Sequence, residues 1–535
     1  MKRLICGGIV YDGTGNPPHV ADVMIRDGVI AALGPDLPRE DAEIIDAKGM
    51  AVTPGFIDMH RHADIAPMLN TQFGALELTQ GITATVTGNC GIACVPVREP
   101  WVEEYRDFVS PIIGPAPREA LFPNYFAYRA MLEKAKLPIH MGFLAGTGAV
   151  KVAVKGFSST PYTPDEMRAA QDFVREAMDA GAFGVSLGFM YQPECYTKPE
   201  EQVSVIQPAA EAGGLLTTHI RGEGNTLVAS VDEVINIAKR AGIRLHISHL
   251  KATGIKNWKR TIFEAMDHIE RARNAGQQVT ADFYPYAGGS TTIFSLIPPG
   301  VLREDNSRTI AYLSSAAGKA HLRREIERED PAWDNMALSI GWDRIVIAGT
   351  ELPEHASFSG RTVQALTEKN GYDHPSDFLA DLLVSEAGKV GIIVLSMDPE
   401  DVDAVARKPY TAVISDALYG VSDHPHPRLY GTFPHFLRSF ARERHVLSIE
   451  EAIRKMTSLP ASVLGLDKMG MIIPGNRADM NIFDMEELTD RATYEDSRRL
   501  CTGMARVLIG GQDALLAGQM TGTQTGQVLR MKSSY

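Results

Sequence analysis

The chain has 535 residues, of which 44% are hydrophobic and 22% charged, a balance typical of a soluble globular protein with a large core. The 53 Lys and Arg residues against 66 Asp and Glu give a formal net charge of −13, which argues against binding to nucleic acid or to an anionic membrane. Five scattered cysteines, no signal-peptide pattern and no apolar run long enough to span a membrane predict a cytoplasmic protein with reduced thiols.

Both ends of the chain are rich in short β-strands. Strand-like apolar runs follow one another within residues 1–54 and again within residues 469–535. Turn signals such as Asp27-Gly28 and Gly510-Gly511 separate them. We therefore predict one small β-sandwich domain that is built from both termini.

The middle of the chain, residues 55–468, repeats a helix, a glycine and a short apolar strand. The residues Thr163 to Glu166 form a capping box, and the helix that follows ends at Gly181 before the strand-like run 183–189. A second capping box is expected from Ser230 to Glu233. Serial units of this kind predict an α/β fold with a (β/α)8 TIM-like barrel. The rhythm lapses at about 293–345, where we expect an insertion late in the barrel or a lid.

A pair of histidines lies at the end of the first strand of this series. His60 and His62 are two residues apart, so on a strand both imidazoles face the same side. Two neutral imidazoles at that spacing suit a zinc-like ion. The position at a strand end favours a metal site over a chance H-x-H pattern.

Four further residues follow predicted strands and could share that site. His219 and His249 each come directly after an apolar run, and either alone would more simply be a hydrogen-bonded core histidine. Cys90, between glycines, is a candidate thiolate ligand or a small buried thiol. Asp416 could bind metal and shuttle a proton, or merely cap a turn. The upstream pair His60 and His62 favours the metal interpretation for all four, whereas His246 is expected to face elsewhere.

With these residues assembled, the chain resembles the amidohydrolase superfamily and, within it, the N-acyl-D-amino-acid deacylases (D-aminoacylases). Segments 54–62 and 474–484 match the superfamily. Segments more specific to the deacylases are 88–91, 218–221, 247–251, 284–286 with 289–291, and 426–434. The resemblance runs almost end to end.

This resemblance implies the site and the reaction. The implied metal is Zn2+, with one tight site at Cys90, His219 and His249 and a second, weaker position near His60, His62 and Asp416. The implied reaction is hydrolysis of the amide bond of an N-acyl-D-amino acid by metal-activated water, with Asp416 as general base and then general acid. The residues implied to hold the substrate carboxylate are Lys251, Tyr284, Ser290 and Arg428, two cations and two hydroxyls that suit such a group.

Other features of the sequence indicate which branch of the superfamily the chain resembles and how its substrate could differ from that of the usual deacylases. Some superfamily members bridge two metals through a carboxylated lysine on the fourth strand, but residues 184–188 here contain no lysine. The chain also differs from the usual deacylase pattern at Arg61, at Ala63-Asp64 and in the loop 415–420, all near the mouth of the site.

Alternative functions stay open at this point. A metal-dependent hydrolase that opens a cyclic amide or lactone, like hydantoinases and dihydroorotases, is the main alternative. A non-catalytic barrel is disfavoured because every candidate metal-site residue is present. The expected partner is a small molecule with a carboxylate, with no nucleic acid and no membrane, and a homo-oligomer is left open.

Overall fold

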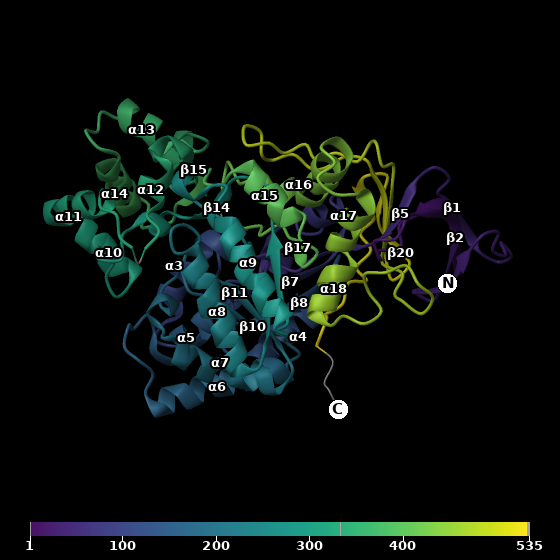
Figure 1. Cartoon of the computed structure of the whole chain (residues 1–535), viewed down its shortest axis with the longest axis horizontal. Coiled ribbons are helices and arrows are strands. Elements are labelled where there is room, and N and C mark those ends of the chain that lie inside the picture. The colour runs from purple at the N-terminus through teal and green to yellow at the C-terminus, as the bar shows by residue number, and fades with distance from the viewer. Residues whose placement is uncertain (1, 332, 421, 532–535) are drawn as a thin grey trace.

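The two ends of the chain share one β-sheet at the right-hand end of the molecule in Figure 1. The structure, a computed structural model, describes residues 2–331, 333–420 and 422–531. The sheet is joined where β5 (Ala51–Pro54) pairs antiparallel with β18 (Met480–Phe483). Its remaining strands are β1 (Lys2–Val10), β2 (His19–Arg26), β3 (Val29–Gly34), β4 (Glu43–Asp46), β19 (Met504–Ile509), β20 (Gln512–Leu516) and β21 (Gln519–Met520).

Parallel strands occupy the centre of the molecule in two sheets. One has the order β6 (Phe56–Asp58), β7 (Ile82–Thr87), β8 (His140–Phe143). The other runs from β9 (Ala145–Gly146) through β10 (Gly184–Gly188), β11 (Leu215–His219), β12 (Arg244–Ile247) and β13 (Val279–Phe283) to β17 (Thr411–Val413). The two sheets meet at both margins, because β9 follows β8 after one residue and a parallel bridge joins Arg61 to Ala417.

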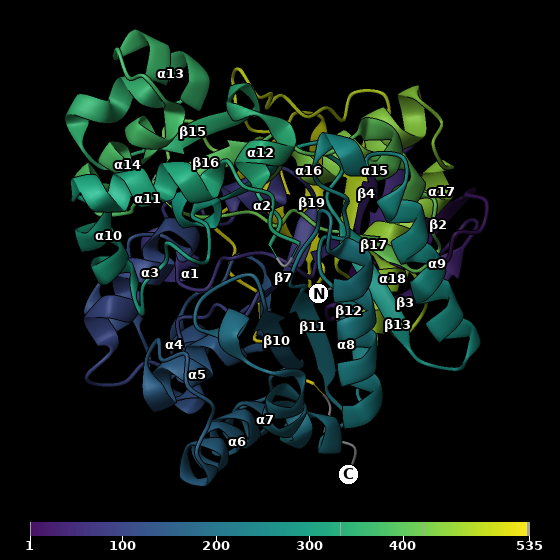
Figure 2. The same ribbon diagram turned by 60° about the vertical axis from the view of Figure 1, so that its left-hand side comes forward.

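Amphipathic helices connect these strands and lie outside them (Figure 2). Helix α6 (Pro164–Asp179) begins at the expected capping box, in which Thr163 Oγ1 accepts from Glu166 N and the Glu166 carboxylate accepts from Thr163 N. Helices α7 (Pro199–Glu211), α8 (Leu227–Ala241) and α9 (Thr261–Asn274) precede β11, β12 and β13. Each helix buries an apolar stripe against the strands, which is what its periodicity requires.

The second predicted capping box is wrong. Helix α8 begins at Leu227, so Ser230 lies inside its first turn instead of at its start. The Ser230 hydroxyl accepts a hydrogen bond from Gly222 N at 3.0 Å, and the carboxylate of Asp334 accepts one from Thr226 N at 3.2 Å. A side chain from a distant segment thus binds the loop that leads into this helix, and among the described residues no side chain caps its first turn.

A segment between β13 and β17 has its own sheet and its own core. Its antiparallel sheet has the order β14 (Gly289–Thr292), β16 (Gly391–Val394), β15 (Ile345–Gly349), and helices α10 (Asn306–Leu313), α11 (Ala316–Ile326), α12 (Met336–Ile340), α13 (Val363–Lys369) and α14 (Pro375–Ser385) surround it. Its buried side chains run from Ile293 to Val394, which is longer than the predicted range 293–345. Strand β15 follows these helices and pairs antiparallel with β16 instead of joining the central sheets, which explains why the helix–strand rhythm lapses here.

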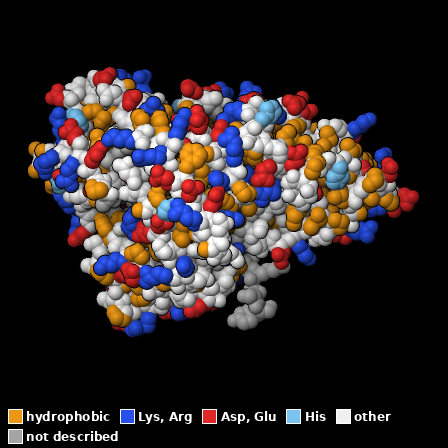
Figure 3. Space-filling model, in the orientation of Figure 1, with side chains coloured by type: hydrophobic (Ala, Val, Ile, Leu, Met, Phe, Trp, Pro, Cys, Tyr) orange, Lys and Arg blue, Asp and Glu red, His pale blue; other side chains and the backbone are white. Residues whose placement is uncertain are grey.

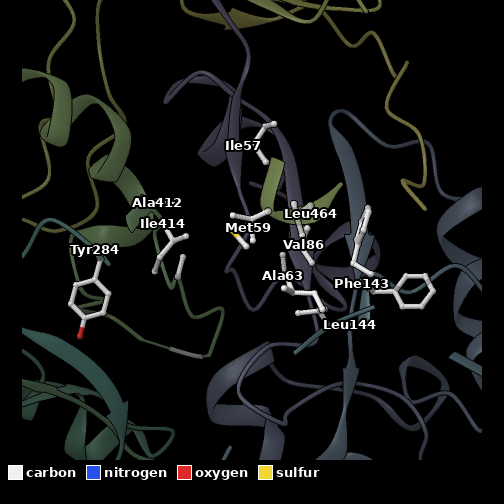
Figure 4. Close-up of a cluster of buried hydrophobic side chains, with 14 of the residues drawn as sticks. Ile57, Met59, Ala63, Val86, Phe143, Leu144, Tyr284, Ala412, Ile414 and Leu464 are labelled. Carbon is white, nitrogen blue, oxygen red and sulfur yellow. The ribbon is translucent and has the colours of Figure 1, made fainter. Parts of the chain in front are cut away.

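The main core lies along the parallel strands. Ile57 of β6 and the next-but-one residue Met59 pack in one cluster with Val86 of β7, Phe143 of β8 and Ala412 of β17 (Figure 4). Acidic and basic side chains are interspersed on the face shown in Figure 3, without a large patch of one sign. Among the described residues, no helix is long and apolar enough to cross a membrane.

Candidate metal and substrate site

The predicted metal-site residues all follow the carboxyl ends of parallel strands. His60 and His62 follow β6, Cys90 follows β7, His219 ends β11, His249 follows β12 and Asp416 follows β17. Parallel strands bring these ends to one edge, so residues far apart in sequence meet there. Three of them, Cys90, His249 and Asp416, have positive φ angles of 55°, 35° and 49°, which non-glycine residues rarely adopt. Such backbone conformations concentrate at functional sites.

The side chains converge around Cys90. Its Sγ lies 3.3 Å from His60 Nε2 and 3.6 Å from His249 Nε2. Two triads are formed, and within each triad the possible ligand atoms all lie within 4.8 Å of one another. One triad is His60, His62 and Cys90, and the other is Cys90, His219 and His249. Asp416 Oδ1 lies 3.4 Å from both His60 Nε2 and His62 Nε2. The six predicted residues therefore form one buried cluster with Cys90 common to both triads.

The orphaned nitrogens of His219 test whether this cluster suits a metal ion. Among the described residues, neither ring nitrogen of His219 has a hydrogen-bond partner, and the Glu223 carboxylate is 3.8 Å from Nε2. A buried imidazole without a partner is costly, unless it ligates a metal. Thiolate and imidazole are the donors that zinc prefers. The residues present fit a zinc ion.

The electrostatics keep Cys90 and Asp416 ionised. Burial alone would raise the pKa of Cys90, but the attraction of His60 and the nearby imidazoles of His219 and His249 hold it well below the ordinary value. Burial likewise opposes ionisation of Asp416, yet Arg428 and His60 bring its pKa well below the usual range. A thiolate and a carboxylate at neutral pH are the forms that can bind a cation.

The residues expected to hold a carboxylate divide between two neighbouring cavities. Lys251, Tyr284 and Ser290 line a cavity of about 50 Å3 together with all of the predicted metal-site residues except His60. Arg428 instead lines an adjoining cavity of about 30 Å3, which Ser290 also borders. Arg428 Nη1 is 2.9 Å from Asp416 Oδ2, and its guanidinium lies over the Tyr284 ring at 4.8 Å.

Sequence and structural comparisons decide the family. The profile of the amidohydrolase family matches residues 43–513. The chain belongs to the amidohydrolase family.

Similar proteins match this amidohydrolase over nearly its whole length. It is 32% identical to an N-acyl-D-glutamate deacylase of Alcaligenes xylosoxydans xylosoxydans, over 100% of this chain and 97% of the relative. It is 31% identical to the N-acyl-D-aspartate deacylase of the same organism, over 98% and 94%. The crystal structure of an N-acyl-D-glutamate deacylase from Bordetella bronchiseptica, complexed with zinc and a phosphonate that mimics the tetrahedral intermediate, matches with a TM-score of 0.83 and 31% identity over 99% of each chain.

Two buried carboxylates that sequence reasoning missed support the site of this amidohydrolase. Glu223 Oε1 lies 3.0 Å from His249 Nδ1 and 2.5 Å from Lys251 Nζ. Asp282 Oδ2 lies 3.4 Å from His60 Nδ1 and 2.9 Å from His246 Nε2. Carboxylates that hold the second nitrogen of a ligand histidine fix its tautomer and orientation.

Arg61 is the other residue whose role the sequence did not predict. Its side chain is fully buried, with Nη2 2.9 Å from Glu77 Oε1, Nε donating to Tyr419 Oη at 2.8 Å and Nη1 donating to Ser415 Oγ at 3.1 Å. Asp58 Oδ2 lies 3.4 Å from Nη1. One guanidinium thus joins the strand that carries the histidine pair to the loop that carries the aspartate of the site.

Proposed function

We propose that this amidohydrolase is a zinc-dependent deacylase that hydrolyses the amide bond of N-acyl-D-amino acids to a carboxylic acid and a free D-amino acid. The observation that carries the proposal is the buried cluster around Cys90, which combines two metal-binding triads with an ionised carboxylate. Full-length similarity to deacylases of N-acyl-D-glutamate and N-acyl-D-aspartate supports the reaction class.

The fold of the proposal is a (β/α)8 barrel of residues 55–468 with a β-sandwich from residues 1–54 and 469–535. The parallel order of β6–β8 and β9–β17, with contacts at both margins, supports closure of the strands. The separate core within Ile293–Val394 supports an insertion late in the barrel, longer than its sequence pattern suggests.

In this proposal Cys90, His219 and His249 hold the tight zinc, and His60, His62 and Asp416 supply a weaker position. Bound zinc supplies Lewis-acid activation of the scissile carbonyl and of water. The protein fixes the donors in advance, because Glu223 holds His249 and Asp282 lies beside His60.

Asp416 moves the proton in the proposed reaction. Its low pKa leaves the carboxylate free to accept a proton from the attacking water at neutral pH. Once protonated, the same group is a strong acid that passes the proton to the leaving nitrogen. Arg428, 2.9 Å away, orients the carboxylate toward the site.

The substrate carboxylate would lie against Lys251, Tyr284, Ser290 and Arg428. To serve there, Ser290 must redirect its hydroxyl, which donates to Ile392 O at 3.0 Å. Lys251 Nζ donates to Glu223 Oε1 at 2.5 Å and to His249 O at 3.0 Å, which leaves one ammonium proton for the substrate carboxylate.

The test measures free amino acid released from paired N-acetyl-D and N-acetyl-L substrates with several side chains by zinc-loaded protein. Release from the D series, absent in the Asp416→Asn variant, is the expected result. Zinc-loaded protein that releases nothing but opens a hydantoin or a dihydroorotate would overturn the proposal in favour of ring opening.

A further inference from the structure

A large cavity lies beside the metal site. Its volume is about 400 Å3, against about 50 Å3 for the cavity that the metal-site residues line. The two share a wall made of Ile112, Met190, Tyr191, Glu223, Thr253 and Met336. The metal site therefore adjoins a space much larger than an acetyl group needs.

Apolar side chains from distant parts of the chain line this cavity. Phe108 comes from α3 (Val102–Ile113) and Phe189 follows β10. The segment between β13 and β17 contributes Phe294, Ile297 and Trp333. A concave, mainly apolar space beside polar catalytic groups is typical of a ligand subsite.

The cavity and the carboxylate-binding residues lie over different strands. Lys251 and Tyr284 follow β12 and β13, whereas the barrel segments that line the cavity are those after β7, β10 and β11, with Thr253 alone from the segment after β12. The segment between β13 and β17 supplies the rest of the lining. The cavity begins at the metal ligands themselves, since the Tyr191 ring centroid is 4.9 Å from that of His219. In an N-acylated amino acid, the acyl chain starts at the scissile carbonyl and extends away from the carboxylate. The cavity is thus placed to receive the acyl chain.

The charges of the cavity wall disfavour an anionic acyl group. Glu104, Asp107 and Asp334 contribute carboxylates to the wall. Among the described lining residues, Arg221 is the only Lys or Arg, and it is engaged: Nη2 lies 3.0 Å from Glu233 Oε1 and Nη1 donates to Cys195 O at 2.8 Å. A second carboxylate on the acyl chain would enter the cavity without a free cation to meet it.

We propose that this cavity binds the acyl chain, and that the preferred substrates carry a long, uncharged, apolar acyl group. The inference rests on the proposed deacylase function and names its substrate class. At about 30 Å3 per water-sized group, a space of this volume holds about a dozen such groups, enough for a medium-length fatty acyl chain.

The experiment measures kcat/KM of zinc-loaded protein for N-acetyl-, N-butanoyl-, N-octanoyl- and N-succinyl-D-alanine. Each buried methylene favours binding by about threefold to fourfold, so octanoyl should exceed acetyl by about 100-fold or more after ordering costs. N-succinyl-D-alanine should be the poorest substrate. Acetyl equal to or better than octanoyl overturns the acyl subsite but not deacylation. No hydrolysis of any D substrate overturns the proposed function itself.

A variant locates the effect in the cavity. Ser295 is half-buried, lines the cavity but not the smaller metal-site cavity, and shares a hydrogen bond of 3.0 Å with Thr291. Ser295→Trp should lower the octanoyl-to-acetyl ratio of kcat/KM by about 30-fold, because the indole occupies the chain's space. Ala317→Trp, on the exposed face of α11, is the matched control and should leave the ratio unchanged. An unchanged ratio in Ser295→Trp overturns the assignment.

Discussion

Replacing Arg61 by methionine removes the charge that joins the two sides of the candidate site while keeping a long side chain. The guanidinium contacts Glu77, Tyr419, Ser415 and Asp58, all within 3.4 Å. Its Nη2 also donates to Leu429 O at 3.4 Å, one residue beyond Arg428. The variant should therefore loosen the loop of Asp416 and the first turn of α16 (Arg428–His435) together.

The expected magnitude follows from burial. Arg61 and Glu77 are fully buried, and removing one partner of such a pair costs about 3–5 kcal/mol in free energy of unfolding because the other charge stays behind. A displacement of about 1 Å in catalytic groups costs about 100-fold in rate. Arg61→Met should thus lower kcat/KM by about 100-fold. The kcat/KM of Arg61→Lys should lie between those of the wild type and Arg61→Met.

The assay combines three measurements on zinc-loaded protein: kcat/KM for the best D substrate, bound zinc per chain, and the midpoint of thermal unfolding. Arg3→Met is the matched control, because Arg3 is buried and lies 2.6 Å from Glu43 and 2.7 Å from Asp513, in the sheet of the two termini. It should lower the midpoint while kcat stays near that of the wild type. Wild-type kcat in folded, zinc-bound Arg61→Met would refute the positioning role.

Three further outcomes are expected. Asp416→Asn should abolish turnover while zinc stays bound, since the amide cannot accept the proton. Substantial activity in a variant whose measured zinc content equals that of the wild type would contradict this role. Cys90→Ser should lose the tight zinc, and the sulfur-to-metal charge-transfer band of cobalt-loaded protein should vanish; an unchanged band would exclude Cys90 as a ligand. Burial alone would raise the pKa of Asp479, but His140 and Arg477 lower it to about 2. This carboxylate contributes about 2–3 kcal/mol of stability above its unfolded pKa of about 4, which is lost as the pH falls toward 2. Asp479→Asn should therefore be less stable at pH 7 and lose less stability between pH 4 and 2, as measured by urea unfolding.

Much of the site was predictable because strand ends in a parallel α/β fold converge. His60, Cys90, His219, His249 and Asp416 each follow a short apolar run, and each lies at the same edge of the central strands. The local rule that a strand ends where its apolar run ends was enough to place them. The helix at Thr163 was predictable for a similar reason, since a capping box is a local hydrogen-bonding pattern.

What the sequence could not reveal depends on contacts between distant segments. Ser230 has the spacing of a cap but lies within α8, and Asp334, over a hundred residues away, binds the loop before that helix. Glu223, in the loop after β11, and Asp282, within β13, support histidines that follow other strands. Which carboxylate meets which histidine depends on how the strands are placed side by side, and tertiary structure alone fixes that.

Strand β10, the fourth strand of the series, lacks a lysine but carries a serine that supports the backbone at Cys90. Strand β10 contains no lysine that could bridge two metals, and its Ser186 points to the turn of Cys90 instead. The Ser186 hydroxyl donates to Gly88 O and accepts from Gly91 N at 3.0 Å, which holds the backbone on both sides of Cys90. A residue with a φ of 55° needs such support, because non-glycine residues avoid that region. A serine at this position therefore suits a chain in which a thiolate, and not a lysine, is common to the two candidate metal-binding triads.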